Sequence, residues 1–239
     1  ETFTDATDDD FFGGSDDDDE AGSPEAITSC DEMAASDLVM VCYSFGDPHF
    51  TSFSGRKYSP MGQGEYVLAQ AGSFSVHACH QPDAAHPSVS RNVGTAIKSQ
   101  WGVLKFITGV TPRAPGGSGI KIEEVGRNRK GAKYRVTFPD GEVVLTGAEG
   151  GATVIKLPAE YCNNVYGLCG AYDPEGGYAN TLTVNDENLS VFDGTSLERF
   201  GGMYMGEFQS VFADSWKVPE GSGEALFSPY ECTSGETYD

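Results

Sequence analysis

The chain has 239 residues, which is long enough for one large domain or two small ones with a real core. Its 31 glycines and its short apolar segments, rich in aromatic and β-branched residues, favour a sheet protein with many turns over a helical bundle. The net charge of −21 argues against nucleic acid as a partner and favours cations, either calcium or basic protein surfaces.

The N-terminal residues carry most of the negative charge. Residues 1–40 hold 14 Asp and Glu and no Lys or Arg, whereas the rest of the chain holds 22 acidic and 15 basic groups. Because like charges at this density repel one another and bury little surface, we predict that residues 5–25 are disordered, within an acidic arm over residues 1–37. Phe11 and Phe12 interrupt the acidic run, and the alternative is that they dock into a groove on a neighbouring subunit.

No membrane span or secretion signal is evident. The apolar runs fall well short of the roughly 20 residues that a bilayer-spanning helix needs. The first five residues, Glu-Thr-Phe-Thr-Asp, lack the basic and apolar regions of a signal peptide. If the protein is secreted, we expect its signal to have been removed or to lie outside this sequence.

From residue 38 onward the pattern is that of short strands separated by turns. Residues 74–79 alternate Phe, Val and Ala with Ser, His and Cys, which is the period of two expected for a strand. Asp140-Gly141 predicts a hairpin turn between two further strands. The other expected strands cover residues 38–44, 64–70, 95–98, 103–108, 133–138, 142–145 and 153–157.

This spacing of about 8–12 residues predicts an all-β fold, an antiparallel sandwich or a barrel-like sheet. Short helical turns are expected near residues 31–36 and 196–199. We place the folded domain at residues 38–227, after the acidic arm and before a C-terminal tail at residues 228–239.

Three motifs occur in a fixed order along this domain. Cys42 is followed by Gly46-Asp47-Pro48-His49-Phe50, then by Gly167-Leu168-Cys169-Gly170, and finally by Phe-Ala-Asp-Ser-Trp-Lys-Val at residues 212–218. Together they resemble the von Willebrand factor type D domain, and the resemblance covers most of the chain. That family consists of extracellular, disulfide-bonded β domains that often bind calcium and build polymers, gels and matrices. The resemblance implies a structural or assembly role.

The even number of cysteines and the lack of a Cys-x-x-Cys pair favour disulfides, and hence an oxidising compartment, over a zinc site. Sequence alone cannot choose among the 15 pairings that six cysteines allow. The resemblance implies a bond between Cys42 and Cys169. By elimination we expect bonds between Cys79 and Cys162 and between Cys30 and Cys232, the alternative being that Cys30 or Cys232 bonds another subunit.

The resemblance also implies a calcium site. Family members that bind calcium use the Asp of Gly-Asp-Pro-His and the loop after Gly-Leu-Cys-Gly, which point here to Asp47, Asp173, Glu175 and Asn180. The chain departs from the family at two positions of that loop, where Ala171 replaces an Asn and Thr181 replaces an acidic residue. The alternative is therefore a structural turn that needs no metal.

Two possible modification sites remain. In some gel-forming relatives the Asp-Pro bond of Gly-Asp-Pro-His breaks, and here Asp47, Pro48 and His49 would be the residues concerned, with His49 supplying a proton. Asn188-Leu189-Ser190 matches the acceptor for N-glycosylation, which suits secretion.

No other catalytic signature is visible, since a nucleophile elbow, a phosphate loop and a zinc-protease helix are all missing. We therefore predict a non-enzymatic, secreted extracellular module that is a building block of a filament, gel or matrix. Its expected partners are other copies of itself or other matrix and surface proteins. The alternatives are a calcium-binding adhesive surface protein that does not polymerise and a proprotein that cleaves itself at Asp47-Pro48.

Overall fold

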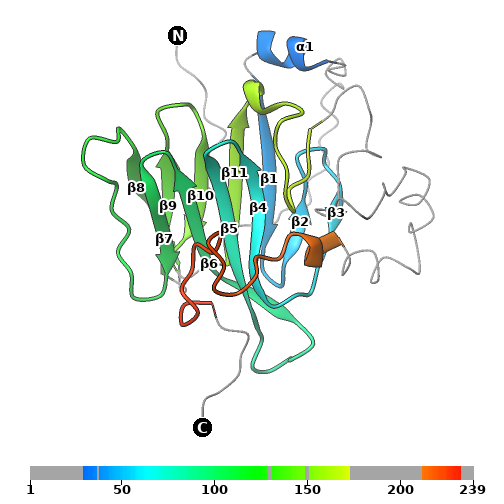
Figure 1. The fold of residues 1–239 in the computed structure, drawn as a ribbon, viewed down its shortest axis with the longest axis vertical. Coiled ribbons are helices and arrows are strands. Elements are labelled where there is room, and N and C mark those ends of the chain that lie inside the picture. The colour runs from blue at the N-terminus through cyan, green and yellow to red at the C-terminus, as the bar shows by residue number, and fades with distance from the viewer. Residues whose placement is uncertain (1–28, 37, 129–130, 149–150, 173–211, 233–239) are drawn as a thin grey trace, which may run out of the picture.

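The computed structural model describes residues 29–36, 38–128, 131–148, 151–172 and 212–232, and within them two antiparallel sheets pack face to face (Figure 1). The larger sheet has seven strands, in the spatial order β3 (Lys57–Tyr58), β2 (His49–Thr51), β1 (Val39–Phe45), β11 (Ala152–Pro158), β10 (Val143–Gly147), β9 (Gly131–Thr137) and β8 (Lys121–Asn128). The smaller has four, in the order β4 (Gly64–Ala71), β5 (Phe74–Pro82), β6 (Ser90–Ser99) and β7 (Gly102–Ile107).

The prediction of an all-β antiparallel fold is confirmed, and the architecture is a sandwich of two sheets. All eight strands expected from the sequence are present within a few residues of their predicted bounds. Sequence reasoning missed β2 and β3, which are only three and two residues long, and β8. β8 has no fully buried residue, so its sequence lacks the alternation that marks a half-buried strand.

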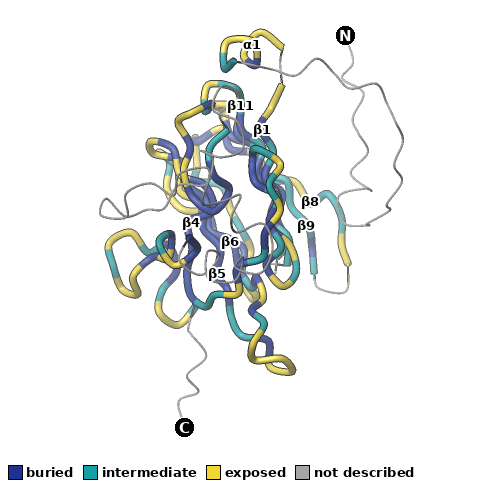
Figure 2. Tube along the Cα trace, turned by 90° about the vertical axis from the view of Figure 1, so that its right-hand side faces the viewer, coloured by how far each residue is buried: buried dark blue, intermediate teal, exposed yellow. Residues whose placement is uncertain are grey.

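The core lies between the two sheets, and buried residues gather along the strands that face each other (Figure 2). At its centre three buried hydroxyls join the layers. Thr95 Oγ1 of β6 lies 2.7 Å from Thr153 Oγ1 of β11 and accepts a hydrogen bond from Thr146 Oγ1 of β10 at 2.9 Å. Because each hydroxyl can both donate and accept a hydrogen bond, all three buried hydroxyls have hydrogen-bond partners within the core.

A third layer covers the outer face of the four-stranded sheet. The segment over residues 217–232 crosses that face, and its apolar side chains form a small second core with the strands beneath them (Figure 1). That core contains Cys79, Ala96, Leu226, Phe227 and Cys232. Both faces of the four-stranded sheet are therefore buried, which explains why β5 reads as almost continuously buried.

Segments at both ends of the described chain are attached to the sandwich. Helix α1 (Cys30–Ala35) begins at Ser29, whose side chain accepts a hydrogen bond from the Glu32 backbone N–H at 3.1 Å, and it buries Met33. At the other end, Glu231 contacts Lys105 of β7 at 2.6 Å. Within the described residues, no helix has the length and apolarity needed to cross a bilayer.

Candidate functional site

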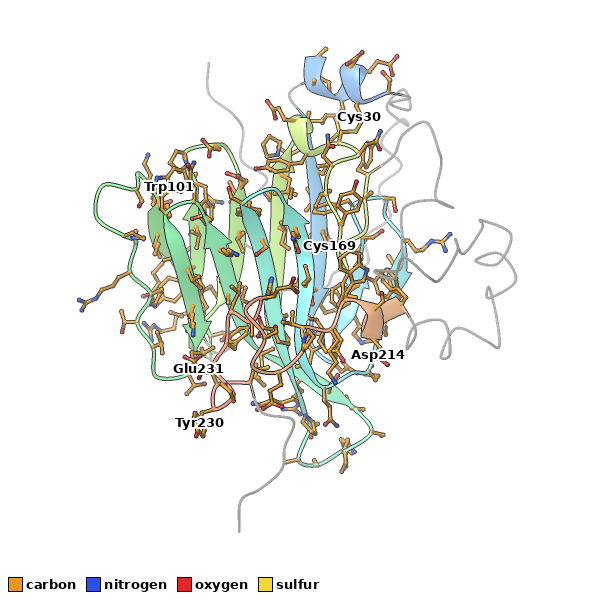
Figure 3. The ribbon with its side chains drawn as sticks, in the orientation of Figure 1. Cys30, Trp101, Cys169, Asp214, Tyr230 and Glu231 are labelled. Carbon is orange, nitrogen blue, oxygen red and sulfur yellow. A yellow bond between two sulfur atoms is a disulfide. The ribbon has the colours of Figure 1, made fainter. Side chains whose placement is uncertain are left out.

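Cys169 of the Gly-Leu-Cys-Gly motif is the point at which the two sheets are joined (Figure 3). Its sulfur is bonded to Cys42 in the middle of β1, its backbone N–H donates to Leu68 O of β4 at 2.8 Å, and its carbonyl accepts from Phe53 N at 3.0 Å. The bond between Cys42 and Cys169 is the pairing that the resemblance implies. It explains why two motifs more than 120 residues apart belong to one structural unit.

The edge of β4 is covered by two of the sequence motifs. Residues 166–169 pair with one half of this strand, through reciprocal backbone hydrogen bonds of 2.8 and 3.0 Å between Gln70 and Tyr166. Residues 216–218 pair with the other half, where Val67 N donates to Trp216 O at 3.0 Å and Val218 N donates to Glu65 O at 2.8 Å. An open edge would be a template for pairing with another chain, so the two motifs close this route to aggregation.

The backbone conformation and the surroundings of position 167 exclude every residue except glycine. Its φ is +129°, and a Cβ at this position would lie 2.5 Å from the carbonyl oxygen of Leu68. That oxygen belongs to the backbone of a buried strand and cannot move aside cheaply. The glycine before Leu168 therefore reflects the close approach of the motif to β4.

The other two disulfides correct the expected pairing. Cys30 is bonded to Cys162 and Cys79 to Cys232, so the expected bonds of Cys79 with Cys162 and of Cys30 with Cys232 are wrong. The reason is the side on which each cysteine lies. Cys79 points away from the seven-stranded sheet toward the C-terminal segment, whereas Cys162 follows η1 (Ala159–Tyr161), which contacts α1. All six cysteines are bonded within the chain, so the alternative of a bond to another subunit is also not supported.

Of the four expected calcium ligands, only Asp47 lies within the described residues. Asp173, Glu175 and Asn180 lie outside them, as do Thr181 and the glycosylation candidate Asn188. Among the residues that the structure describes, no three His, Cys, Asp or Glu side chains gather in a way that could hold a metal ion.

The position of Asp47 relative to the loop also matters. Asp47 lies five residues beyond Cys42 along the β1–β2 hairpin, which is about 16 Å at roughly 3.3 Å per residue. Tyr172, which directly precedes Asp173, accepts a hydrogen bond from Asn163 N at 3.1 Å. Because Asp173 lies outside the described residues, the pairing of Asp47 with the loop stays a prediction.

The Asp47-Pro48 bond lies in the turn between β1 and β2. The Asp47 and His49 side chains are about half exposed, and His49 Nε2 lies 3.1 Å from Asp47 Oδ1. The other ring nitrogen, Nδ1, lies 2.7 Å from Ser59 Oγ. The imidazole is therefore held between the carboxylate and a hydroxyl, and the three residues singled out for self-cleavage lie together.

A buried carboxylate that sequence reasoning missed holds the third layer in place. Glu65 of β4 is 7% exposed, lies 2.6 Å from His77 Nδ1, and accepts hydrogen bonds from the backbone N–H groups of Leu226 at 2.7 Å and Phe227 at 3.3 Å. We call these four residues the Glu65 clasp. An acidic residue inside an otherwise apolar strand was the available signal, because a buried carboxylate needs partners.

Two ionisable groups near the clasp have shifted pKa values. Burial lowers the pKa of His80 to about 3, and among the described residues its Nε2 has no hydrogen-bond partner, so the ring is neutral. For Glu231, desolvation acts to raise the pKa, but hydrogen bonds from Lys105 and the Ser228 backbone outweigh it and the pKa is lowered. Glu231 therefore remains a carboxylate that fixes the C-terminal segment to β7.

Comparison with known proteins places this architecture in context. A family model described as the von Willebrand factor type D domain matches residues 42–185. Similar proteins include SCO-spondin of Gallus gallus, 30% identical over 59% of the chain, and mucin-5AC of Homo sapiens, 27% identical over 81%. Hemocytin of Bombyx mori is 26% identical over 74% of the chain. The chain spans only 3%, 3% and 5% of the lengths of these relatives.

Proposed function

Because the chain belongs to the von Willebrand factor type D domain family, we propose that it is an extracellular building block of a filament, gel or matrix. It works by binding other copies of itself or other matrix and surface proteins, and it catalyses no reaction on a substrate. The mucin among its relatives supports this class of function.

The observation that carries the proposal is the closed disulfide framework. Bonds from Cys42, Cys30 and Cys79 tie the two sheets, helix α1 and the C-terminal segment into one unit. Such a framework suits an oxidising extracellular environment and a module that bears load without changing shape. With every cysteine bonded inside the chain, its contacts with neighbours would be non-covalent.

We also propose that calcium binds the loop after Gly170, through Asp173, Glu175 and Asn180. Calcium prefers six to eight hard oxygen ligands on a flexible turn, and this stretch supplies carboxylate, amide and carbonyl oxygens. Asp47 is the weakest of the four candidates, since its carboxylate already contacts His49. Secretion and a glycan at Asn188 belong to the same proposal, and digestion with an N-glycosidase would show the glycan as a loss of mass.

Light scattering of the oxidised protein, with and without millimolar calcium, tests both proposals. We expect the mass to grow with calcium and to return after addition of a chelator. Asp173→Asn should abolish this growth, whereas Asp47→Asn should leave most of it. A constant monomer mass in both conditions would rule out self-assembly and favour the alternative of an adhesive surface protein.

A second candidate function is self-cleavage at Asp47-Pro48, which the contact between Asp47 and His49 favours. The Asp47 carboxylate would attack its own carbonyl carbon to form an anhydride, and the Pro48 nitrogen would leave with a proton from His49. Water then opens the anhydride. Incubation at pH 5 followed by N-terminal sequencing tests this, because a new terminus at Pro48 is required and a single intact chain after several days excludes it.

A further inference from the structure

The outer face of the seven-stranded sheet carries an apolar stripe along β1. Met40, Cys42 and Ser44 point into the core, so the alternate residues Val39, Val41, Tyr43 and Phe45 point outward. Three of these four are strongly exposed, at 47% for Val39, 40% for Tyr43 and 48% for Phe45. Large apolar side chains exposed in a row mark an interaction surface more often than isolated ones do.

Three residues of this stripe, Val39, Val41 and Tyr43, line a groove of about 330 Å³. Met33 of α1, Phe53 and Tyr172 also line the groove, so it lies where β1 meets α1 and the segments around residues 53 and 172. The lining is mainly apolar, and the volume is sufficient for one or two aromatic side chains.

The same outer face is positively charged, although the chain as a whole is strongly negative. Cross-strand register places one row of side chains from Lys57 through Tyr43 to Arg135, and a second row from Val41 through Lys156 to Lys121. With Lys133, this face has five of the 15 basic residues of the chain, against one carboxylate, Glu123, which pairs across the strands with Arg135. Among the described residues, Lys57, Lys121 and Lys156 make no ion pair.

We propose that residues 1–28 of the same chain dock on this face, with Phe11 and Phe12 in the groove and the acidic runs over the basic rows. These 28 residues hold 11 Asp and Glu and no Lys or Arg, so their charge is complementary to that of the face. The adjacent Phe11 and Phe12 supply two aromatic side chains to occupy the apolar groove. This docking goes beyond the proposed function, because it applies equally to a chain that never assembles.

The geometry of the connection supports docking within one chain. The arm ends at Ser29, which caps α1, and Met33 of that helix lines the groove. Phe12 and Ser29 are 17 positions apart, and an extended chain of that length reaches up to about 60 Å, more than the length of β1. Because the arm is covalently joined to the domain, its effective concentration at the groove is on the order of millimolar, so weak contacts suffice to keep the arm on its own domain.

Photo-crosslinking in the full-length oxidised chain tests the proposal. Phe12 is replaced by p-benzoylphenylalanine, the protein is irradiated at several concentrations, and the joined peptides are mapped by mass spectrometry. We expect Phe12 to be joined to peptides that contain Met33, Met40 or Tyr43 in a product of monomer mass, with a yield independent of protein concentration. Raising the salt from 0.05 to 0.5 M should lower the yield, because it screens the charge contacts.

Matched variants identify the surface. Tyr43→Thr in the same chain should abolish the crosslink, whereas Val103→Thr, at a similarly exposed position on β7, should leave it unchanged. Benzoylphenylalanine at Phe3 instead of Phe12 should give little product at the groove. A crosslink found only in products of dimer mass would overturn the proposal, because a second copy would then be the occupant. Crosslinks spread over the surface, or unaffected by Tyr43→Thr, would overturn it as well.

Discussion

From the contacts of the Glu65 clasp we predict that Glu65→Gln, which changes one side-chain oxygen to nitrogen, greatly lowers the stability of the fold. Glu65→Gln keeps the shape of the side chain but replaces a carboxylate oxygen by an NH₂ group. Oε1 of Glu65 contacts both Leu226 N and His77 Nδ1, and Oε2 accepts from Phe227 N, so in either orientation the new NH₂ group faces a backbone N–H donor. The variant therefore loses at least one charge-assisted hydrogen bond and leaves a buried donor unsatisfied.

The magnitude follows from the burial of the pair. Glu65 and His77 are 7% and 4% exposed, so water cannot replace the lost partner. A hydrogen bond to a charged group contributes about 1.5–3 kcal/mol, and an unsatisfied buried donor costs about 1–3 kcal/mol. Because glutamine retains one oxygen as an acceptor, part of the interaction survives, and we expect the free energy of unfolding to fall by about 2–4 kcal/mol.

The assay is urea unfolding of the oxidised protein, followed by tryptophan fluorescence. Glu220→Gln is the matched control, because Glu220 lines the same small cavity beside Glu65 but is exposed, and it should change the free energy of unfolding by less than about 0.5 kcal/mol. A loss below about 1 kcal/mol for Glu65→Gln, or a loss equal to that of the control, would refute the reasoning that the carboxylate holds the third layer.

Two further predictions concern buried groups. The unfolded chain protonates His80 near pH 6.5 but the folded chain only near pH 3, so His80 lowers stability as the pH falls through this window, by at most about 1.4 kcal/mol per pH unit. His80→Phe should flatten the dependence of the unfolding free energy on pH between 6 and 4, and an unchanged slope would contradict this. Gly167→Ala should destabilise by about 3 kcal/mol or more, because its Cβ would meet Leu68 O. Gly151→Ala, which combines a positive φ with open space, should cost only about 1–2 kcal/mol in the same urea assay, and equal losses would count against the steric argument.

Local patterns predicted most of the fold. Strands such as β5 and β11 were visible because one face or both are buried, which produces alternating or continuous apolar residues. β8 was not visible because it lies at a sheet edge with little burial, and β3 was too short to form a pattern. The third layer could not be predicted, since residues 217–232 have no regular period and their place depends on long-range contacts.

The candidate site shows the same limit. The bond between Cys42 and Cys169 followed from a resemblance to a family, whereas the partners of Cys79 and Cys162 depend on which face of the sandwich each residue occupies. Glu65 was visible as an acidic residue within a strand, but the backbone groups that it binds lie about 160 residues later. Sequence patterns can therefore identify a buried charge, but they do not identify a partner that lies far away along the chain.

The spacing of the disulfides has a consequence for synthesis of the chain. Each bond joins cysteines 127 to 153 residues apart, so no native bond can close until synthesis has passed Cys162. At a synthesis rate of roughly 5–20 residues per second, Cys42 waits about 6–25 seconds for Cys169. During that interval Cys30 and Cys42, only 12 positions apart, are each other's nearest available thiols. If the chain is secreted as proposed, its yield should therefore depend on an isomerase that reopens premature bonds between early cysteines.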